Sequence, residues 1–261
     1  MRLVIFKRRC FYRWGIGLGI CLLLVFLLVS GVPAGIIAVF DTIDREVPIY
    51  SVETQEKKIA ISFDAAWGAD YTDRLLEILK EHDVKTTFFL TGIWVKKYPD
   101  KVKEIAAAGH EIGNHSTTHP HCAALSAEEL KKEILENEEM IYKLTGRRTR
   151  LFRPPFGEYN NQVILTCRSL GYEVIQWSVD SLDWQEVGVE SVVDRVLKNI
   201  HPGAIVLFHN NAKYTPQALP IILKSLKEQG YKIVPVSELL IKKDYYIEKH
   251  TGIQRKKGSR R

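Results

Sequence analysis

Short apolar runs alternate with amphipathic stretches about seven times along the chain, and this alternation limits the fold more than any other feature. The first pair is the apolar run from Lys58 to Asp64 and the stretch from Tyr71 to His82, whose leucines and isoleucines recur at helical spacing. Strands that alternate with helices are typical of parallel sheets whose strands are joined by helical crossovers. We therefore expect an α/β fold built on a parallel sheet or barrel.

The later units repeat this pattern. Ser126 begins a helix with the capping box S-A-E-E, and Gly146 ends it. The other strands are expected at 84–90, in the segment leading to His115, and at 149–152, 172–177, 204–208 and 231–234, with helices at 101–108, 126–144, 161–170, 189–200 and 216–229.

Candidate reactive side chains follow five of the predicted strands. They are Asp64, the pair His115 and His119, Arg153, Asp183 and His209. Taken singly, each has a structural explanation, such as a surface arginine, a turn aspartate or a core histidine. The carboxyl ends of parallel strands share one edge, where α/β folds place their chemistry. We therefore expect these side chains to meet at one site.

The segment from Asn114 to His121 contains three histidines, and His115 and His119 have H-x-x-x-H spacing. This spacing predicts two rings on one face of a helical turn, close enough to hold one metal ion. The alternative is a polar loop in which the histidines occur by chance. Neutral imidazole nitrogens are donors suited to zinc.

The ordered set S-F-D, H-S-T-T-H, R-P-P-F-G, D-S-L-D-W and L-F-H resembles the polysaccharide deacetylases of the NodB-homology type, also called carbohydrate esterase family 4. The resemblance runs from Lys57 to Leu240. The F-D-A-A-W-G form of the first motif is most similar to the sporulation-associated subgroup. The resemblance implies a distorted (β/α) barrel of about seven parallel strands. It also implies a divalent metal, usually zinc, and removal of N-acetyl groups from amino sugars of peptidoglycan or a related cell-wall glycan.

The resemblance also implies a role for each of the four candidate acid–base residues. Asp64 is the general base that takes a proton from water, and Arg153 keeps it ionised and oriented. His209 is the general acid that protonates the leaving amine. Asp183 holds the ring of His209 and raises its pKa.

Metal and substrate contacts follow from the same resemblance. His115 and His119 are the implied metal ligands. The backbone N–H of Phe156 is implied to help hold the oxyanion. Trp184 and Leu207 are implied to wall a small apolar pocket for the acetyl methyl group.

One departure from the family pattern concerns the metal. Ala65 stands where the family has a second aspartate, which is its third metal ligand. Three alternatives stay open: Asp70 approaches from the next turn, His121 serves as a third nitrogen, or the site is weak or empty. The last alternative supports a second hypothesis, a glycan-binding or scaffolding protein with impaired catalysis. Phe156 replaces the usual tyrosine, which is a mild change because its backbone carries the role.

The residues before the domain predict a membrane anchor. Residues 14–40 are almost uninterruptedly apolar, longer than the roughly 20 residues that span a bilayer, and the flanking positive charge lies on their N-terminal side. We expect a single-pass protein with a cytoplasmic N-terminus and an extracytoplasmic domain. A cleaved signal peptide is the alternative, with Val32-Pro33-Ala34 as the possible cleavage site. The expected segments are a basic N-terminus at 1–13, the anchor at 14–40, a linker at 41–56, the domain at 57–240 and a basic tail at 241–261.

The net charge of +6 is concentrated at the two ends of the chain, and the middle is close to neutral. A nucleic-acid-binding domain would carry a basic face on the fold itself, so we expect no nucleic-acid partner. The tail from Lys242 is expected to be loose, with contact to anionic wall polymers or lipid headgroups as the alternative. Cys122 and Cys167 are the cysteines of the exported domain, and their spacing indicates neither a disulfide framework nor a metal site.

Overall fold

The computed structural model describes residues 45–258, which form one domain from Glu46 onward. The anchor predicted at residues 14–40 lies outside this range. Within the described range, no helix is both long enough and apolar enough to cross a bilayer. The strands of the main sheet are β2 (Lys58–Ala65), β3 (Thr87–Leu90), β4 (Glu111–Asn114), β5 (Leu151–Phe152), β6 (Glu173–Val174), β7 (Val179–Asp180), β8 (Ile205–His209) and β9 (Lys232–Val234).

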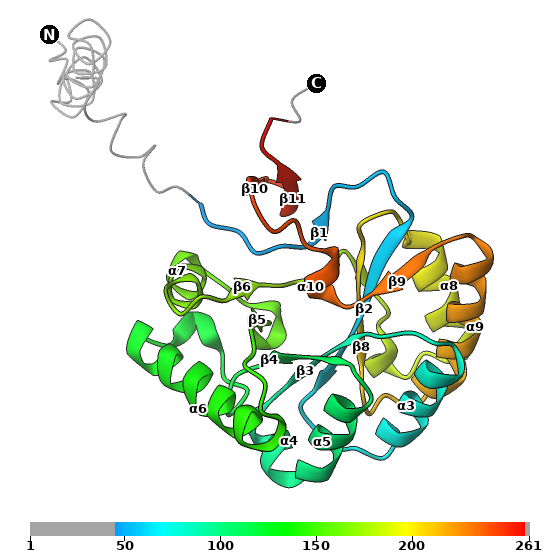
Figure 1. Ribbon diagram of the computed structural model, residues 1–261, viewed down its shortest axis with the longest axis horizontal. Coiled ribbons are helices and arrows are strands. Elements are labelled where there is room, and N and C mark those ends of the chain that lie inside the picture. Colours follow the sequence, from blue (N-terminus) through cyan, green and yellow to red (C-terminus); the bar gives the residue numbers. More distant parts are fainter. Residues whose placement is uncertain (1–44, 259–261) are drawn as a thin grey trace, which may run out of the picture. The chain divides into compact units, whose positions relative to one another are not determined.

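The main sheet is an open, barrel-like parallel sheet (Figure 1). Its seven-strand path runs β6-β5-β4-β3-β2-β8-β7, every pairing is parallel, and β9 pairs with the start of β2. No ladder joins β6 to β7 among the described residues, so the barrel stays open there. This confirms the predicted α/β fold with about seven parallel strands.

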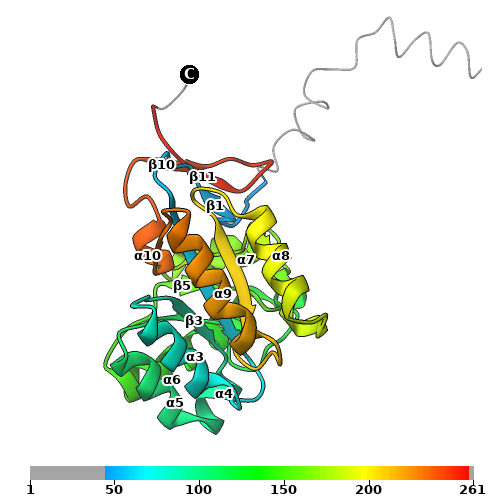
Figure 2. The same ribbon diagram turned by 90° about the vertical axis from the view of Figure 1, so that its right-hand side faces the viewer.

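Helices cover the outside of this sheet (Figures 1 and 2). They are α3 (Thr72–Glu81), α4 (Gly92–Lys97), α5 (Pro99–Ala107), α6 (Ala127–Thr145), α7 (Asn161–Ser169), α8 (Val189–Asn199), α9 (Thr215–Glu228) and the short α10 (Val236–Leu239). The capping box at Ser126 and the left-handed C-cap at Gly146 (φ 67°) bound α6, as predicted. The helix α4 was not predicted from the sequence; it begins directly after β3 with Thr91 as its N-cap.

The central strand β2 places the first candidate residue inside the barrel. Ile59, Ile61 and Phe63 pack in the core between the sheet and its helices. Side chains alternate across a strand, so Ser62 and Asp64 point to the opposite, inner face. The strand is nearly all buried, because a parallel sheet is covered on both faces.

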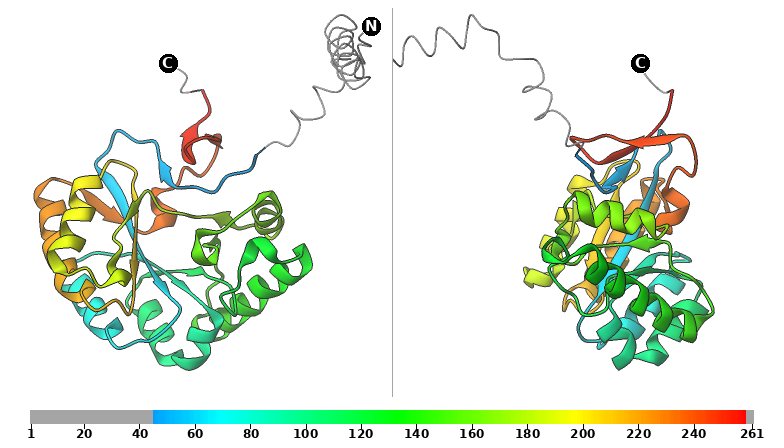
Figure 3. Two further views of the ribbon diagram at one scale, coloured as in Figure 1. Left: turned by 180° about the vertical axis from the view of Figure 1, so that it is seen from behind. Right: turned by 90° about the vertical axis from the view of Figure 1, so that its left-hand side faces the viewer.

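The domain extends beyond the predicted 57–240 at both ends. Val47 and Ile49, which we placed in a linker, are buried, and the Ile49 N–H donates to the Val174 carbonyl at 2.8 Å. The expectation of a loose tail is wrong for the described residues. There, β10 (Tyr245–Ile247) pairs antiparallel with β11 (Ile253–Lys256), which pairs parallel with β1 (Ser51–Val52). This small sheet lies at one end of the domain (Figures 2 and 3).

The side-chain amide of a buried glutamine joins the small sheet to the backbone of the segment after α10. Gln254 of β11 is fully buried, and its side chain accepts from the Ile241 N–H at 2.8 Å and donates to the Ile241 carbonyl at 3.0 Å. Satisfying both ends of a buried amide stabilises the hairpin, since an unpaired polar group would be costly there. The two cysteines, Cys122 and Cys167, are free and buried, and burial raises the pKa of the Cys122 thiol to about 12.

Candidate active site

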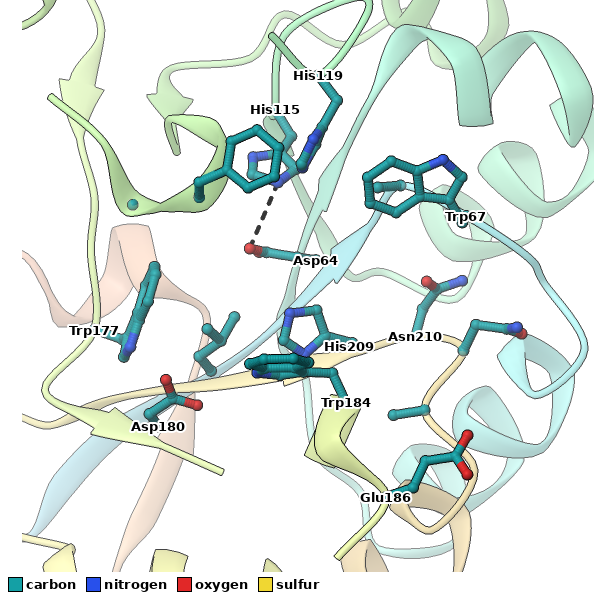
Figure 4. A pocket seen from close by; sticks show the side chains of 16 residues that line it. Asp64, Trp67, His115, His119, Trp177, Asp180, Trp184, Glu186, His209 and Asn210 are labelled. Carbon is teal, nitrogen blue, oxygen red and sulfur yellow. Dashed lines mark ion pairs between the residues drawn. The ribbon is translucent and has the colours of Figure 1, made fainter. Parts of the chain in front are cut away.

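The candidate residues meet at a cavity of about 680 Å³ on the edge of the barrel where the strands end (Figure 4). Seven of the nine predicted site residues line it: Asp64, His115, His119, Phe156, Trp184, Leu207 and His209. The other two, Arg153 and Asp183, are fully buried behind Asp64 and His209. The geometry therefore brings together every residue that the sequence placed at the site.

A buried ion pair fixes Asp64 at the end of β2. The Arg153 Nη1 donates to Asp64 Oδ1 at 2.7 Å, and Nη2 donates to the Ser62 hydroxyl at 2.9 Å. Burial alone would raise the pKa of Asp64, but the charge and hydrogen bond of Arg153, together with the nearby His115 and His209, outweigh it and hold the pKa below its usual value. Asp64 is therefore an ionised base whose second oxygen, Oδ2, is left for the cavity.

A second pair fixes His209 at the end of β8. The His209 Nδ1 lies 2.7 Å from Asp183 Oδ1, and Asp183 Oδ2 accepts from the His209 N–H at 2.9 Å and from the Thr215 hydroxyl at 2.6 Å. Burial lowers the pKa of His209, but the hydrogen bond and charge of Asp183 outweigh it and raise the pKa above its usual value. Because Nδ1 donates to Asp183, Nε2 is left for proton transfer.

The two histidine rings lie together, though not on a helical turn. His115 and His119 sit in a tight loop after β4, in which Ser116 (φ 68°) and His119 (φ 61°) have left-handed backbone. The ring centroids are 5.0 Å apart. The predicted helical turn is wrong, because the left-handed residues Ser116 and His119 reverse the direction of the chain. The predicted proximity of the two imidazole rings is confirmed.

Each ring is neutral at ordinary pH. Burial lowers the pKa of His115, and burial together with the neighbouring His115 lowers the pKa of His119 to about 4. The His115 Nδ1 donates to the Arg153 carbonyl at 2.6 Å, so its Nε2 carries the lone pair and lies 3.6 Å from Asp64 Oδ2. Two acceptors facing each other favour a cation or a hydrogen-bond donor between them.

Comparison with known proteins decides the family. The family model for polysaccharide deacetylase matches residues 51–175. The peptidoglycan-N-acetylmuramic acid deacetylase PdaA of Bacillus subtilis is 35% identical over 206 residues, covering 77% of this chain and 78% of the relative. The chain belongs to the polysaccharide deacetylase family. A peptidoglycan-N-acetylglucosamine deacetylase of Bacillus cereus is 41% identical over 196 residues, covering 73% of this chain and 92% of that protein.

Solved structures of family members match the fold. BA3943 of Bacillus anthracis, described as a CE4 family pseudoenzyme, superposes with a TM-score of 0.72 at 40% identity, over 75% of this chain and 69% of that one. A mutant of BA3943 described as having restored enzymatic activity superposes equally well, with a TM-score of 0.72 at 42% identity over 75% of this chain and 71% of that one. Polysaccharide deacetylases of similar sequence thus include both active and inactive members.

The two histidines fall one ligand short of the three-ligand metal site that the family resemblance implies. Ala65 is fully buried in the core cluster. Asp70 does not line the cavity and is tied to Asn211 by two hydrogen bonds, and the His121 ring pairs with Glu158 at 2.9 Å. Among residues 45–258, no group of three or more histidine, cysteine, aspartate or glutamate side chains is arranged to hold a metal. The donors present therefore do not complete a three-ligand zinc site.

Backbone strain concentrates in the loops of this site. Seven non-glycine residues in the described range have positive φ, and five of them lie in the site loops: Ser116, His119, Phe156, Leu182 and Glu186. Such residues cost about 1–3 kcal/mol each and persist where the surrounding structure holds them. This concentration supports a functional assignment for the cavity.

Several residues that line the cavity were not among the predicted site residues, and they include Trp67, Trp177, Asp180, Glu186 and Asn210. Two of them had a signal in the sequence. Trp67 closes the first motif, F-D-A-A-W, and Asn210 follows His209 directly. Trp177 had none, because it lies in the irregular segment between β6 and β7 that we read as strand.

Proposed function

We propose that this chain is a hydrolase that removes the N-acetyl group from amino sugars of peptidoglycan. The observation that carries the proposal is the pair of preorganised groups in one cavity: an ionised Asp64 held by Arg153, and a His209 held by Asp183. Two polysaccharide deacetylases of similar sequence, named for peptidoglycan substrates, support the choice of glycan.

The chain's own side chains supply the proton transfers of such a reaction. Asp64 Oδ2 takes a proton from a water whose oxygen attacks the acetyl carbonyl carbon. The backbone N–H of Phe156 is the proposed donor to the oxygen that becomes negative. His209 Nε2 then gives its proton to the sugar nitrogen as the carbon–nitrogen bond breaks, so that acetate leaves and the amine stays on the sugar. Trp184 and Leu207 line the cavity where the acetyl methyl would lie.

The resemblance implies a divalent metal, usually zinc, which would polarise the carbonyl and lower the pKa of the bound water. His115 and His119 are the donors offered to it. Because these two residues fall one ligand short, no step above is assigned to a metal. A glycan-binding protein with impaired hydrolysis is the second candidate. It is favoured by Ala65 and by the similarity to BA3943.

Acetate release decides between these two candidates. The soluble domain, residues 45–261, is incubated with N-acetylglucosamine oligomers or muropeptides, with and without added zinc, and acetate is measured. We expect release that exceeds that of an Asp64→Asn variant. Glycan binding without acetate above the Asp64→Asn level on any of these substrates would overturn the hydrolase proposal in favour of the second candidate.

We also propose the cellular setting that the sequence implies. The chain is anchored by residues 14–40 with its domain outside the cytoplasm, and it acts in spore formation. The support is the apolar run with its flanking charge and the form of the first motif. Protease accessibility of the domain in intact cells tests the orientation, and digestion only after lysis would contradict it.

A further inference from the structure

The three most exposed large apolar side chains of the described domain all lie at the mouth of one cavity. They are Trp67 (63% exposed), Trp184 (57%) and Phe156 (56%). Single exposed apolar residues are ordinary on protein surfaces, whereas a group of aromatic side chains around a hollow marks a binding site. Trp184 and Phe156 belong to motifs already assigned to the reaction, but Trp67 has no assigned role.

The loop that carries Trp67 is held in place by hydrogen bonds to the neighbouring residue, Gly68. The Gly68 carbonyl accepts from the Trp94 indole N–H at 2.6 Å and from the Asn210 amide at 3.1 Å. Gly68 has a φ of +65°, and a Cβ added there would lie 2.1 Å from the Asn211 amide nitrogen. The loop is therefore clamped to the segment after β8, and Trp67 is presented to solvent in a preset position.

Trp67 lies opposite Trp184 across the catalytic carboxylate. In Figure 4, Trp67 is on the side of His119 and Trp184 is on the side of His209, with Asp64 between them. The Trp67 and His119 rings meet at an angle of 65° with centroids 4.6 Å apart. This contact leaves most of the indole uncovered, so packing against His119 does not account for a side chain of this size.

The charge of the cavity lining restricts the ligand. Asp64, Asp180 and Glu186 line the cavity, and among the described lining residues none is lysine or arginine. Carboxylates accept hydrogen bonds from sugar hydroxyls, but they disfavour a ligand that carries its own carboxylate. The lining therefore suits an uncharged sugar ring.

We propose that Trp67 is a stacking platform for an uncharged N-acetylglucosamine ring, next to the ring whose acetyl group enters between Asp64 and His209. The apolar C–H face of a pyranose covers the indole, while the hydroxyls stay hydrogen-bonded to polar groups of the mouth. The inference rests on the proposed function for its choice of ligand. It concerns binding alone, so it can be tested apart from hydrolysis.

The test measures binding of an N-acetylglucosamine tetramer by calorimetry, with chelator present so that no metal contributes. We expect Trp67→Ala to weaken binding by about tenfold or more, since truncating a central tryptophan anchor commonly costs over 1 kcal/mol. Trp67→Phe, which keeps an aromatic face, should retain part of the affinity. Tyr246→Ala is the matched control, because Tyr246 is 42% exposed on β10 and does not line the cavity.

Four results would overturn the inference. The first is wild-type affinity in Trp67→Ala, and the second is no measurable binding by the wild-type domain. The third is unchanged glycan binding with weakened zinc binding, which would make Trp67 a support for His119. The fourth is an equal loss of affinity in the control variant Tyr246→Ala. Acetate release, assayed separately, reports on the proposed function, so a failure of hydrolysis is distinguishable from a failure of stacking.

Discussion

The acid–base half of the cavity and its histidine half are built differently. Asp64 and His209 each have a buried partner of opposite charge, at 2.7 Å in both cases. The histidines have no partner as close as these, since His115 Nε2 faces Asp64 Oδ2 only at 3.6 Å. The His119 Nδ1 is buried and finds no hydrogen-bond partner among the described residues, and Ala65 stands where the family resemblance implies a third metal ligand.

The contrast shows that the histidine loop keeps its shape without a complete metal site. The His115 ring is held by the Arg153 carbonyl, and the Ser116 hydroxyl accepts from the His119 N–H at 3.2 Å. The His119 ring lies between Trp67 and Phe156, with centroids 4.6 Å from each. Protein contacts therefore preorganise the donors, and the number of donors, rather than their placement, limits metal binding.

The largest effect should come from uncoupling His209 from its partner. Asp183→Asn keeps the shape but removes the charge that raises the pKa of His209. We expect acetate release to fall by roughly 10²- to 10⁴-fold. His209 must be protonated to act as the acid, so activity declines as pH rises through its raised pKa, and the variant should decline at lower pH. Histidine NMR titration measures the shift, and an unchanged His209 pKa would contradict this reading.

Breaking the ion pair between Arg153 and Asp64 should lower the stability of the domain. Arg153→Met leaves the Asp64 charge buried without a counterion, so the free energy of unfolding should fall by about 3–5 kcal/mol. Arg168→Met is the control, because its ion pair with Glu46 is at the surface and should cost at most about 1 kcal/mol. Urea unfolding followed by circular dichroism measures both. If both variants lost the same free energy of unfolding, the buried pair of Asp64 and Arg153 would contribute no more to stability than a surface ion pair.

Adding a carboxylate beside the two histidines should increase the zinc affinity of the site. Ala65→Asp is expected to raise zinc affinity by more than the roughly 10- to 100-fold that supporting partners of metal ligands contribute. Ala65 is fully buried, so the variant should be less stable without zinc and should gain melting temperature when zinc is added. A loss of stability that zinc does not reverse would place the new carboxylate in the core and contradict the prediction.

The smallest effect is expected at His121. Its ring stacks on Phe156 at 4.5 Å, pairs with Glu158 and is 65% exposed in its side chain, so it is not a third ligand. His121→Ala should leave zinc affinity unchanged and alter the free energy of unfolding by less than about 1 kcal/mol. Isothermal titration with zinc tests this, and a tenfold loss of affinity would restore His121 as a donor.

The sequence predicted the site because its residues follow from strand topology. Asp64, His115, Arg153 and His209 come at the ends of strands, and parallel strands bring their carboxyl ends to one edge. The conformation of the histidine loop was not predictable, because left-handed backbone at Ser116 and His119 carries no composition signal. The residues around Asp70 in the sequence likewise could not show that its side chain is held by Asn211, which lies 141 residues away.

The ends of the domain were missed for a related reason. Ile49 and Gln254 lie in short polar segments with no clear periodicity, and they are buried only because distant strands cover them. Strands as short as β1 and β10 gain their stability from the sheet that they join. The predicted domain boundaries at residues 57 and 240 therefore lie inside the folded domain.

The pairing of Ser51 with Ile253 makes neighbours of the first and last strands of the domain. Because β1 and β11 run in the same direction, tension applied between the two ends would slide these strands along each other and load their hydrogen bonds together rather than one at a time. The β1–β11 pairing, together with the hydrogen bonds of Ile49 to Val174 and Gln176, would therefore carry such a load before the central strands of the barrel do.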